Sequence, residues 1–361
     1  MPPMRGICLC SLAFLISALA APAAGPAAGR QYEVQLRRND YTSVPAPSVL
    51  RAAGFSKVIL RVFSDDEKNG GLYFNNGLFP LVRPALDLWA RAFALGPVPL
   101  WAWMGARKFA WLDDPNLLDS EWNAGATRRI PKLDLFNPQA LELIVRLFGR
   151  LARQQVRGIL IQDDLTLLRR EGFSNWGKAS FSRASGMAAL ENLMLQKGSA
   201  QNLAWEELKV KCVGTVLARI VAACHEVDPA IQVGLNIHYE APRQAAHARS
   251  WYAFDAQAAD AAGVDLFYLM AYHRQMKAEM KLGEGDNRIY FRLMLEAALK
   301  LWGPKLIVKI QIRDWQDSML IPFAELKTYF DLIPTGVERV CFAAADPEDI
   351  DLISQIINKS K

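Results

Sequence analysis

Cysteine and histidine are scarce in this chain of 361 residues, which contains five cysteines and four histidines. Cys8 and Cys10 lie near the N-terminus, whereas Cys212 and Cys224 fall on one predicted helix. At 1.5 Å per residue that helix separates the second pair by about 18 Å, too far for a disulfide. The histidines lack the spacing of a zinc site; they are His225, His238, His247 and His273. We therefore expect no disulfide framework, no metal and no other cofactor.

Several signatures of function are also missing. The chain contains no G-x-S-x-G elbow, no P-loop and no H-E-x-x-H motif, which weakens the case for nucleophilic-serine, nucleotide-dependent or zinc-dependent chemistry. The formal net charge of +5 is small and spread along the chain, without a basic tail. A nucleic-acid partner is therefore not expected. After the N-terminal region, no segment is apolar over the length that a membrane span requires.

The N-terminal region reads as a secretory signal peptide, residues 1–23. A short basic start precedes an apolar run and a region of small residues, in which Ala18-Leu19-Ala20 and Ala21-Pro22-Ala23 both fit an A-x-A cleavage site. The apolar run is too short for a membrane span. We expect an exported protein, periplasmic or extracellular, with a retained N-terminal anchor as the alternative.

Eight apolar, β-branched segments alternate with helical segments along the rest of the chain. Near-continuous apolar strands are typical of a parallel sheet that helices cover on both faces. The sequence therefore predicts an α/β fold, a single-domain (β/α)8 TIM-type barrel over residues 30–355. The predicted strands are 32–38, 57–64, 98–106, 157–164, 231–239, 264–273, 305–315 and 338–346.

Two of the intervening helices have clear sequence signals. Asn137 is a plausible N-cap, and Pro138 suits the first helical position. A second helix is predicted over residues 205–227, which end before an Asp-Pro pair. The first helix has one apolar stripe at helical spacing, formed by Leu141, Ile144, Val145, Phe148 and Leu151.

Polar and aromatic residues recur where the predicted strands end. In a barrel of this type these ends line the active-site mouth, and amides, charges and aromatic faces together suit a carbohydrate. Taken singly, each residue can equally be an ordinary core or rim residue, and His238 can be structural. We predict substrate-binding roles for Arg61, Asp65, Trp101, Trp103, Asn236, His238, Tyr272, Gln311 and Trp315, with Tyr268, His273 and Asp346 in the same region.

The apolar segment "GILIQDD" ends in two adjacent carboxylates, Asp163 and Asp164. Adjacent acids repel each other, and burying either is unfavourable unless it is paired or protonated. A surface turn that ends the strand explains the pair simply. Because the segment is among the most hydrophobic in the chain, we favour the other interpretation, in which both are catalytic residues.

From "SKVILRVFSDDEKNGGLYFNN" through "PLWAWM", "RGILIQDD", "LFYLMAYH" and "IVKIQIRDWQD", the chain resembles the C-terminal domain of PgaB-type proteins, which process poly-β-1,6-N-acetyl-D-glucosamine in biofilms. The resemblance implies a barrel glycoside hydrolase, partners in exopolysaccharide synthesis or export, and the absence of the deacetylase domain that precedes the hydrolase in those proteins. It places Asp163 and Asp164 on the family's acidic pair. The remaining matches lie on its glycan groove: Arg61, Asp65, Trp103, Asn236, Tyr272, Gln311 and Trp315.

Two departures from that family bear on the substrate. Gln162 stands where the family typically has histidine, and the following "LTLLRREGFS" offers Glu171 after two arginines instead of several further acids. Such a loop favours a less cationic glycan than a heavily deacetylated glucosamine polymer.

Adjacent aspartates are too close in sequence to flank a sugar as two separated carboxylates do. They suit substrate-assisted cleavage, in which the 2-acetamido oxygen of the sugar is the nucleophile. On this interpretation Asp163 polarises the amide, and Asp164 is the general acid with a pKa raised by its neighbour. The alternative is a non-catalytic glycan-binding protein that guides a polysaccharide during export or biofilm formation.

Overall fold

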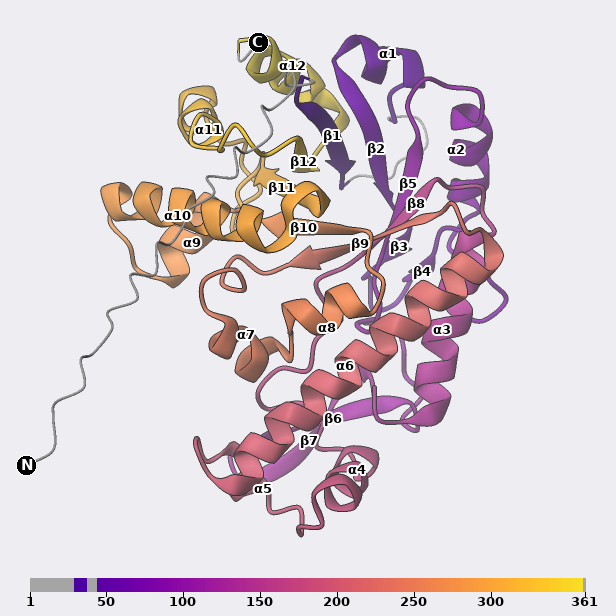
Figure 1. The fold of residues 1–361 in the computed structure, drawn as a ribbon. Coiled ribbons are helices and arrows are strands. Elements are labelled where there is room, and N and C mark those ends of the chain that lie inside the picture. Colours follow the sequence, from indigo (N-terminus) through magenta and orange to yellow (C-terminus); the bar gives the residue numbers. More distant parts are fainter. Residues whose placement is uncertain (1–28, 38–43, 360–361) are drawn as a thin grey trace, which may run out of the picture.

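The computed structural model describes residues 29–37 and 44–359. Its centre is a closed barrel of parallel strands in which β1 pairs with both β2 and β12 (Figure 1). The predicted TIM-type barrel is confirmed, whereas the predicted signal peptide, with Cys8 and Cys10, lies outside the described residues. The barrel strands are β1 (Gln31–Leu36), β2 (Phe55–Arg61), β5 (Leu100–Met104), β8 (Gly158–Ile161), β9 (Gln232–Ile237), β10 (Leu266–Met270), β11 (Leu306–Gln311) and β12 (Arg339–Ala345).

Every barrel strand ends earlier than the sequence predicts. The predicted strand 157–164, for example, is β8 over Gly158–Ile161. Asp163 and Asp164 therefore belong to the loop that follows the strand. Apolar periodicity detects a buried segment, but a strand ends where its backbone stops pairing with its neighbours, and these loops bond elsewhere.

Alternation along the strands separates two environments. One set of side chains packs outward against the helices, as Val34, Ile161 and Phe342 do in the large apolar core. The other set points into the barrel, where a smaller cluster contains Ile59, Trp101, Leu160 and Tyr268. The inward positions also hold charged and polar groups, and this is where the prediction of near-continuous apolar strands fails.

Helices surround the barrel on its outer side (Figure 1). They are α1 (Pro47–Ala52), α2 (Ala85–Phe93), α3 (Pro138–Ala152), α4 (Asn175–Ser185), α5 (Glu191–Leu195), α6 (Ala200–Val227), α7 (Ala245–Tyr252), α8 (Ala256–Ala261), α9 (His273–Glu279), α10 (Glu284–Trp302), α11 (Phe323–Phe330) and α12 (Ile350–Asn358), with 3-10 turns at Gly303–Lys305 and Pro347–Asp349. Across the described ranges 29–37 and 44–359, no helix has the length and apolar character that crossing a bilayer requires.

The two helices predicted in detail are present. Asn137 caps α3 by accepting from the backbone N–H of Gln139, and Pro138 is its first residue. The buried face of α3 is rotated from the predicted stripe, because Leu147 is buried whereas Leu141 and Val145 are only half-buried. The helix predicted at 205–227 begins earlier, at Ala200. It carries both Cys212 and Cys224, as expected.

Two insertions not predicted from the sequence enlarge one end of the barrel. The hairpin β6 (Leu118–Asn123) and β7 (Ala126–Leu133) lies between β5 and α3, and α4 and α5 lie between β8 and α6. Figure 1 shows hairpin, α4 and α5 gathered around the first turns of α6. A further small hairpin, β3 (Phe63–Ser64) with β4 (Gly71–Leu72), follows β2. Insertions after the strands are where barrels of this type build their sites.

Candidate active site

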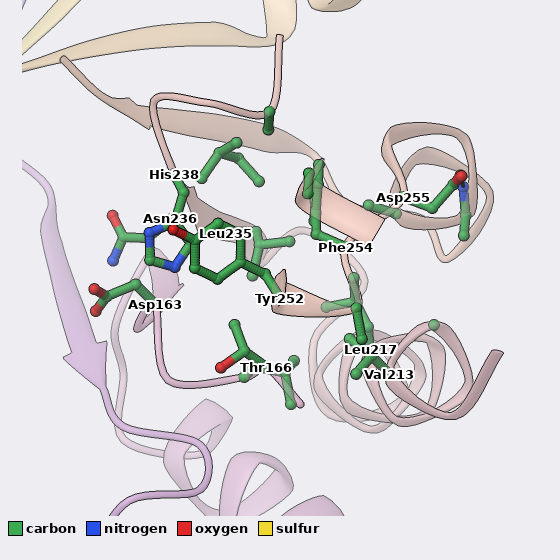
Figure 2. Close-up of a pocket in the computed structure, with 18 of the residues that line it drawn as sticks. Asp163, Thr166, Val213, Leu217, Leu235, Asn236, His238, Tyr252, Phe254 and Asp255 are labelled. Carbon is green, nitrogen blue, oxygen red and sulfur yellow. Dashed lines mark hydrogen bonds between the residues drawn. The ribbon is translucent and has the colours of Figure 1, made fainter. Parts of the chain in front are cut away.

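Asp163 is the carboxylate that lies open at the barrel mouth. It is half-buried, and within the described residues it takes part in no hydrogen bond or ion pair. Figure 2 shows it beside Asn236, His238 and Tyr252, with which it lines one pocket. Burial raises the pKa of Tyr272 and lowers that of Lys309; the Asp163 charge adds to the first effect and opposes the second, so both side chains lie within its electrostatic reach. A free carboxylate among these groups is available to a ligand.

Asp164 has very different surroundings. Its two oxygens accept from the backbone N–H groups of Ala106 at 2.9 and 3.1 Å, Arg107 at 2.7 Å and Lys108 at 2.6 Å. Burial raises the pKa of the Asp164 carboxyl above its ordinary value, against the lowering effect of these three amides. The predicted catalytic pair is thus divided between one open carboxylate and one that fixes the loop after β5.

Arg107, whose backbone N–H bonds Asp164, uses its side chain to bind further loops beneath the mouth. Its side chain is 0% exposed and donates to the carbonyls of Leu133 and Thr166 at 2.7 and 2.6 Å. It also pairs with Asp119 and, at 2.5 Å, with Glu171. One guanidinium therefore joins the loops after β5 and β8 to the β6–β7 hairpin.

The two acids that pair with Arg107 have pKa values shifted in opposite directions. Burial raises the pKa of Asp119 to about 7 although Arg107 acts to lower it. For Glu171, burial is outweighed by Arg107 and Lys132, which hold its pKa below the ordinary value. Lys132 lies 2.5 Å from the Glu171 carboxylate. Glu171, the one acid left in the loop after the pair, is thus engaged within the protein.

Lys309 was missed by sequence reasoning. Its ammonium group donates to the Asn236 side-chain oxygen at 2.7 Å, and the residue is 1% exposed. Burial lowers its pKa to about 8, opposed by the charges of Cys341 and Asp163. The available signal was a lysine between two outward-facing apolar residues of the segment "LIVKIQ".

Unpartnered polar atoms also lie at the mouth. Strand pairing places Gln35, Trp103, Asn236 and Lys309 in one inward layer, because alternate strands contribute to each layer of such a barrel. In the described part of the chain, buried side-chain atoms without a hydrogen-bond partner include the Oε1 atoms of Gln35, Gln162 and Gln311 and the Nε1 atom of Trp103. Buried polar atoms normally have partners, so these are positions where a polar ligand or water would bind.

The prediction that Trp101 contacts the substrate is wrong. It is 1% exposed and belongs to a deeper layer, where the Lys57 ammonium lies 3.8 Å from its ring centre. Lys57 in turn pairs with Glu33 at 2.8 Å, and the Tyr268 hydroxyl donates to Glu33 at the same distance. Tyr268 is accordingly a core residue. The spacing of two alternate tryptophans on one strand does not show which of them lies above the other.

Three further predicted residues lie at the rim. Arg61 forms an ion pair with Asp65, and its guanidinium lies over the rings of Phe63 and Trp103, at 4.3 and 5.6 Å. Trp315 follows β11 and is 46% exposed, the exposure expected of a stacking surface.

The other strand-end residues divide between the mouth and the barrel exterior. His238 stacks on Tyr252, with 4.1 Å between ring centres; Tyr252, on α7, was not predicted. His273 turns away from the mouth, 2.8 Å from Glu325 and stacked on Tyr329. Asp346 pairs with Arg37 and Arg313. Neither His273 nor Asp346 is therefore free to contact a ligand at the mouth.

Comparisons with known proteins agree with this architecture. The sequence profile of a family described as hypothetical glycosyl hydrolase family 13 matches residues 49–342. No protein with a curated description matches the chain in sequence. Among solved structures, the PgaB (BpsB) glycoside hydrolase domain from Bordetella bronchiseptica superposes with a TM-score of 0.74 at 18% identity, covering 91% of this chain and 99% of that one.

Larger glycosidases share the fold over part of their length. A β-galactosidase from the psychrophilic Marinomonas ef1 gives a TM-score of 0.59 at 12% identity, over 91% of this chain and 59% of that one. A β-galactosidase from the Antarctic haloarchaeon Halorubrum lacusprofundi gives 0.61 at 11% identity, over 91% and 58%. At such identities the likeness establishes the fold alone.

Proposed function

Because the chain belongs to the hypothetical glycosyl hydrolase family 13, we propose that it is an exported glycoside hydrolase that cleaves a β-1,6-linked N-acetylglucosamine or glucosamine exopolysaccharide. The observation that carries the proposal is the mouth itself. There the free carboxylate of Asp163 faces amides and aromatic rings, and several buried polar atoms have no hydrogen-bond partner among the described residues. The similarity of the fold to a PgaB hydrolase domain supports the choice of polymer.

The contacts of the two aspartates favour catalytic roles that differ from those predicted from the sequence, where Asp164 was the general acid. Asp164 already accepts three backbone N–H groups, so its oxygens are not free to approach a glycosidic bond. We assign proton transfer to Asp163, and to Asp164 the positioning of the loop after β5.

The proposed reaction balances with one carboxyl group. Asp163, once it has taken up a proton from solvent, gives that proton to the leaving glycosidic oxygen, while the acetamido oxygen of the same sugar attacks the anomeric carbon and forms a cyclic intermediate. Water then opens that intermediate and returns a proton to Asp163. The unpartnered Oε1 atom of Gln162 or Gln311 can accept from the acetamido N–H and so orient the nucleophile.

A product assay tests the proposal. The purified protein is incubated with fully acetylated and with partially deacetylated poly-β-1,6-N-acetylglucosamine, and the products are identified by mass spectrometry. Shorter oligosaccharides from the wild type, and none from Asp163→Asn, are expected. Intact polymer after incubation would overturn the hydrolase.

One observation favours a second function, a glycan-binding protein that guides the polymer during export or biofilm formation. Only one member of the aspartate pair is open at the mouth, so the geometry of two free carboxylates is missing. Such a protein would work with exopolysaccharide synthesis or export components as partners. It would retain polymer binding in co-sedimentation after Asp163→Asn, and the wild type would release no products.

A further inference from the structure

A second groove lies beside the mouth and is lined by residues of the first turns of α6 and of the helix α7. Figure 1 shows where these two helices lie on the barrel. The lining of this groove includes Arg169, Lys197, Asn202, Glu206, His247 and Trp251, and we call it the Trp251 groove. None of these residues belongs to the predicted site. Trp251 is 46% exposed and stacks on His247, with 5.4 Å between ring centres. A broad aromatic face is therefore held in place at the groove wall.

The groove also presents groups that can hydrogen-bond a ligand. Glu206 accepts from Ser250 at 2.6 Å and from Asn202 at 3.3 Å, and both bonds reach the same oxygen. Its other oxygen therefore accepts no bond from the described residues. Arg169 uses one nitrogen to donate to the Leu195 carbonyl at 2.8 Å, and its remaining N–H groups form no hydrogen bond with the described residues. An aromatic face beside such donors and acceptors is the combination that binds a sugar ring.

The Trp251 groove and the mouth are separate hollows that meet at the end of α7, where successive residues line them. Trp251 is followed directly by Tyr252, the residue that stacks on His238 next to Asp163 (Figure 2). The His247 ring contacts both, lying 5.4 Å from Trp251 and 5.9 Å from Tyr252. A polymer long enough to pass over the end of α7 would therefore extend from one site to the other.

The charges of the groove indicate which sugar it would accept. Arg169 and Lys197 bring two positive charges against the single carboxylate of Glu206. A sugar with a free ammonium group would be repelled, whereas the carbonyl oxygen of an acylated nitrogen can accept from either cation.

We propose that the Trp251 groove is a subsite for an N-acylated sugar unit of the same polysaccharide chain whose cleavage occurs at Asp163. This inference rests on the proposed function for the identity of the polymer. It adds a binding site remote from the reacting bond and a preference for acetylated over deacetylated units. Because chain length decides whether a ligand reaches both sites, the groove should affect long oligosaccharides and spare short ones.

The test measures equilibrium binding by calorimetry, with all variants in the Asp163→Asn background so that no ligand is consumed. Fully acetylated β-1,6-linked oligomers of increasing length are titrated into the parent, into Trp251→Ala and into Trp176→Ala. Trp176 lies on α4, outside the Trp251 groove, and at 47% exposure it is a matched control. We expect Trp251→Ala to raise the Kd of long oligomers by about tenfold and that of the dimer by less than about twofold, while Trp176→Ala matches the parent.

The charge preference is tested with one further variant. Oligomers of equal length, fully acetylated or partially deacetylated, are compared in the parent and in Lys197→Gln. We expect the parent to bind the acetylated oligomer several-fold more tightly, and the substitution to narrow that difference. Equal binding of long oligomers by Trp251→Ala and Trp176→Ala would overturn the subsite. A preference of the parent for the deacetylated oligomer would overturn the assigned sugar.

Binding distinguishes failure of the subsite from failure of the proposed function. A wild type that releases no products, combined with weaker long-oligomer binding in Trp251→Ala, would reject the hydrolase and keep the subsite. Normal turnover with no effect of Trp251→Ala on binding would keep the hydrolase and reject the subsite.

Discussion

The Asp164 carboxylate lies 2.7 Å from the backbone nitrogen of Arg107, the residue whose side chain is itself held by the β6–β7 hairpin and the loop after β8. One aspartate therefore fixes the backbone of the residue that joins three loops of the mouth. Asp163, its neighbour in sequence, forms no such bond with the residues that the structure describes. Two adjacent carboxylates with unlike surroundings can serve unlike purposes.

Asp163→Asn and Asp164→Asn are expected to fail in different ways. Asp163→Asn should lower kcat by about two to four orders of magnitude and leave the free energy of unfolding nearly unchanged, because no internal bond is lost. Asp164→Asn should lower that free energy by about 2–4 kcal/mol, because an amide cannot replace a carboxylate that accepts three N–H groups. Urea unfolding followed by circular dichroism, beside the product assay, checks both. Equal stability of the two variants would contradict the positioning role of Asp164.

Arg107→Met is expected to destabilise the protein by about 3–5 kcal/mol, because Asp119 and Glu171 would remain buried without their cation. The matched control is Arg128→Met, which removes an exposed arginine that pairs with Glu121 in the same hairpin. Its cost should stay below about 1 kcal/mol. The measurement is the denaturant midpoint of unfolding of each variant. Similar midpoints would show that the Arg107 network contributes little to stability.

The barrel could be predicted because its outward-facing side chains carry a strong apolar signal. Residues such as Val34, Ile161 and Phe342 mark the strands that helices cover. The β6–β7 hairpin could not be predicted in the same way. Its strand β7, Ala126–Leu133, reads "ATRRIPKL", is largely exposed, and is held by charges on other elements.

The candidate site was only partly visible in the sequence. Strand ends identified Asp163, Asn236 and His238, because polar residues stand out after apolar runs. Depth along the barrel was not visible, so the core residue Trp101 was grouped with the half-exposed Trp103. Tyr252 was missed for a different reason. It comes from α7 and reaches the mouth only through tertiary packing.

Trp101 and Trp315 provide a direct contrast between a core and a rim tryptophan. Trp101→Ala should lower the free energy of unfolding by about 3–5 kcal/mol, because it leaves a cavity beside Lys57. Trp315→Ala should leave stability within about 0.5 kcal/mol and raise KM for the polymer without lowering kcat. Thermal unfolding and steady-state kinetics on both variants check this. A stable Trp101→Ala protein with a raised KM would restore Trp101 to the binding surface.

Lys309 should make stability depend on pH on the alkaline side of neutrality. Its pKa is lowered by burial to about 8 in the folded protein, against 10.5 for the ordinary side chain. Between those values the unfolded chain binds more protons than the folded one, so this group makes the free energy of unfolding rise with pH, by roughly 1–3 kcal/mol. Lys309→Met should remove that rise, and it should also free the Asn236 oxygen that the ammonium now holds.

Lys209 needs a separate control, because burial lowers its pKa to about 8 as well. Urea unfolding of the wild type, Lys309→Met and Lys209→Met at intervals between pH 7 and pH 10.5 separates the two contributions. Each single variant should lose the contribution of its own lysine, measured at each pH as the difference in free energy of unfolding from the wild type, and the two losses should add in the double variant, since the two lysines share no described contact. Buried cysteines and tyrosines, whose raised pKa values make stability fall with pH over the same range, contribute alike to all four proteins. An unchanged slope in Lys309→Met would mean that its ammonium group titrates normally, and the lowering of its pKa by burial would then have to be abandoned.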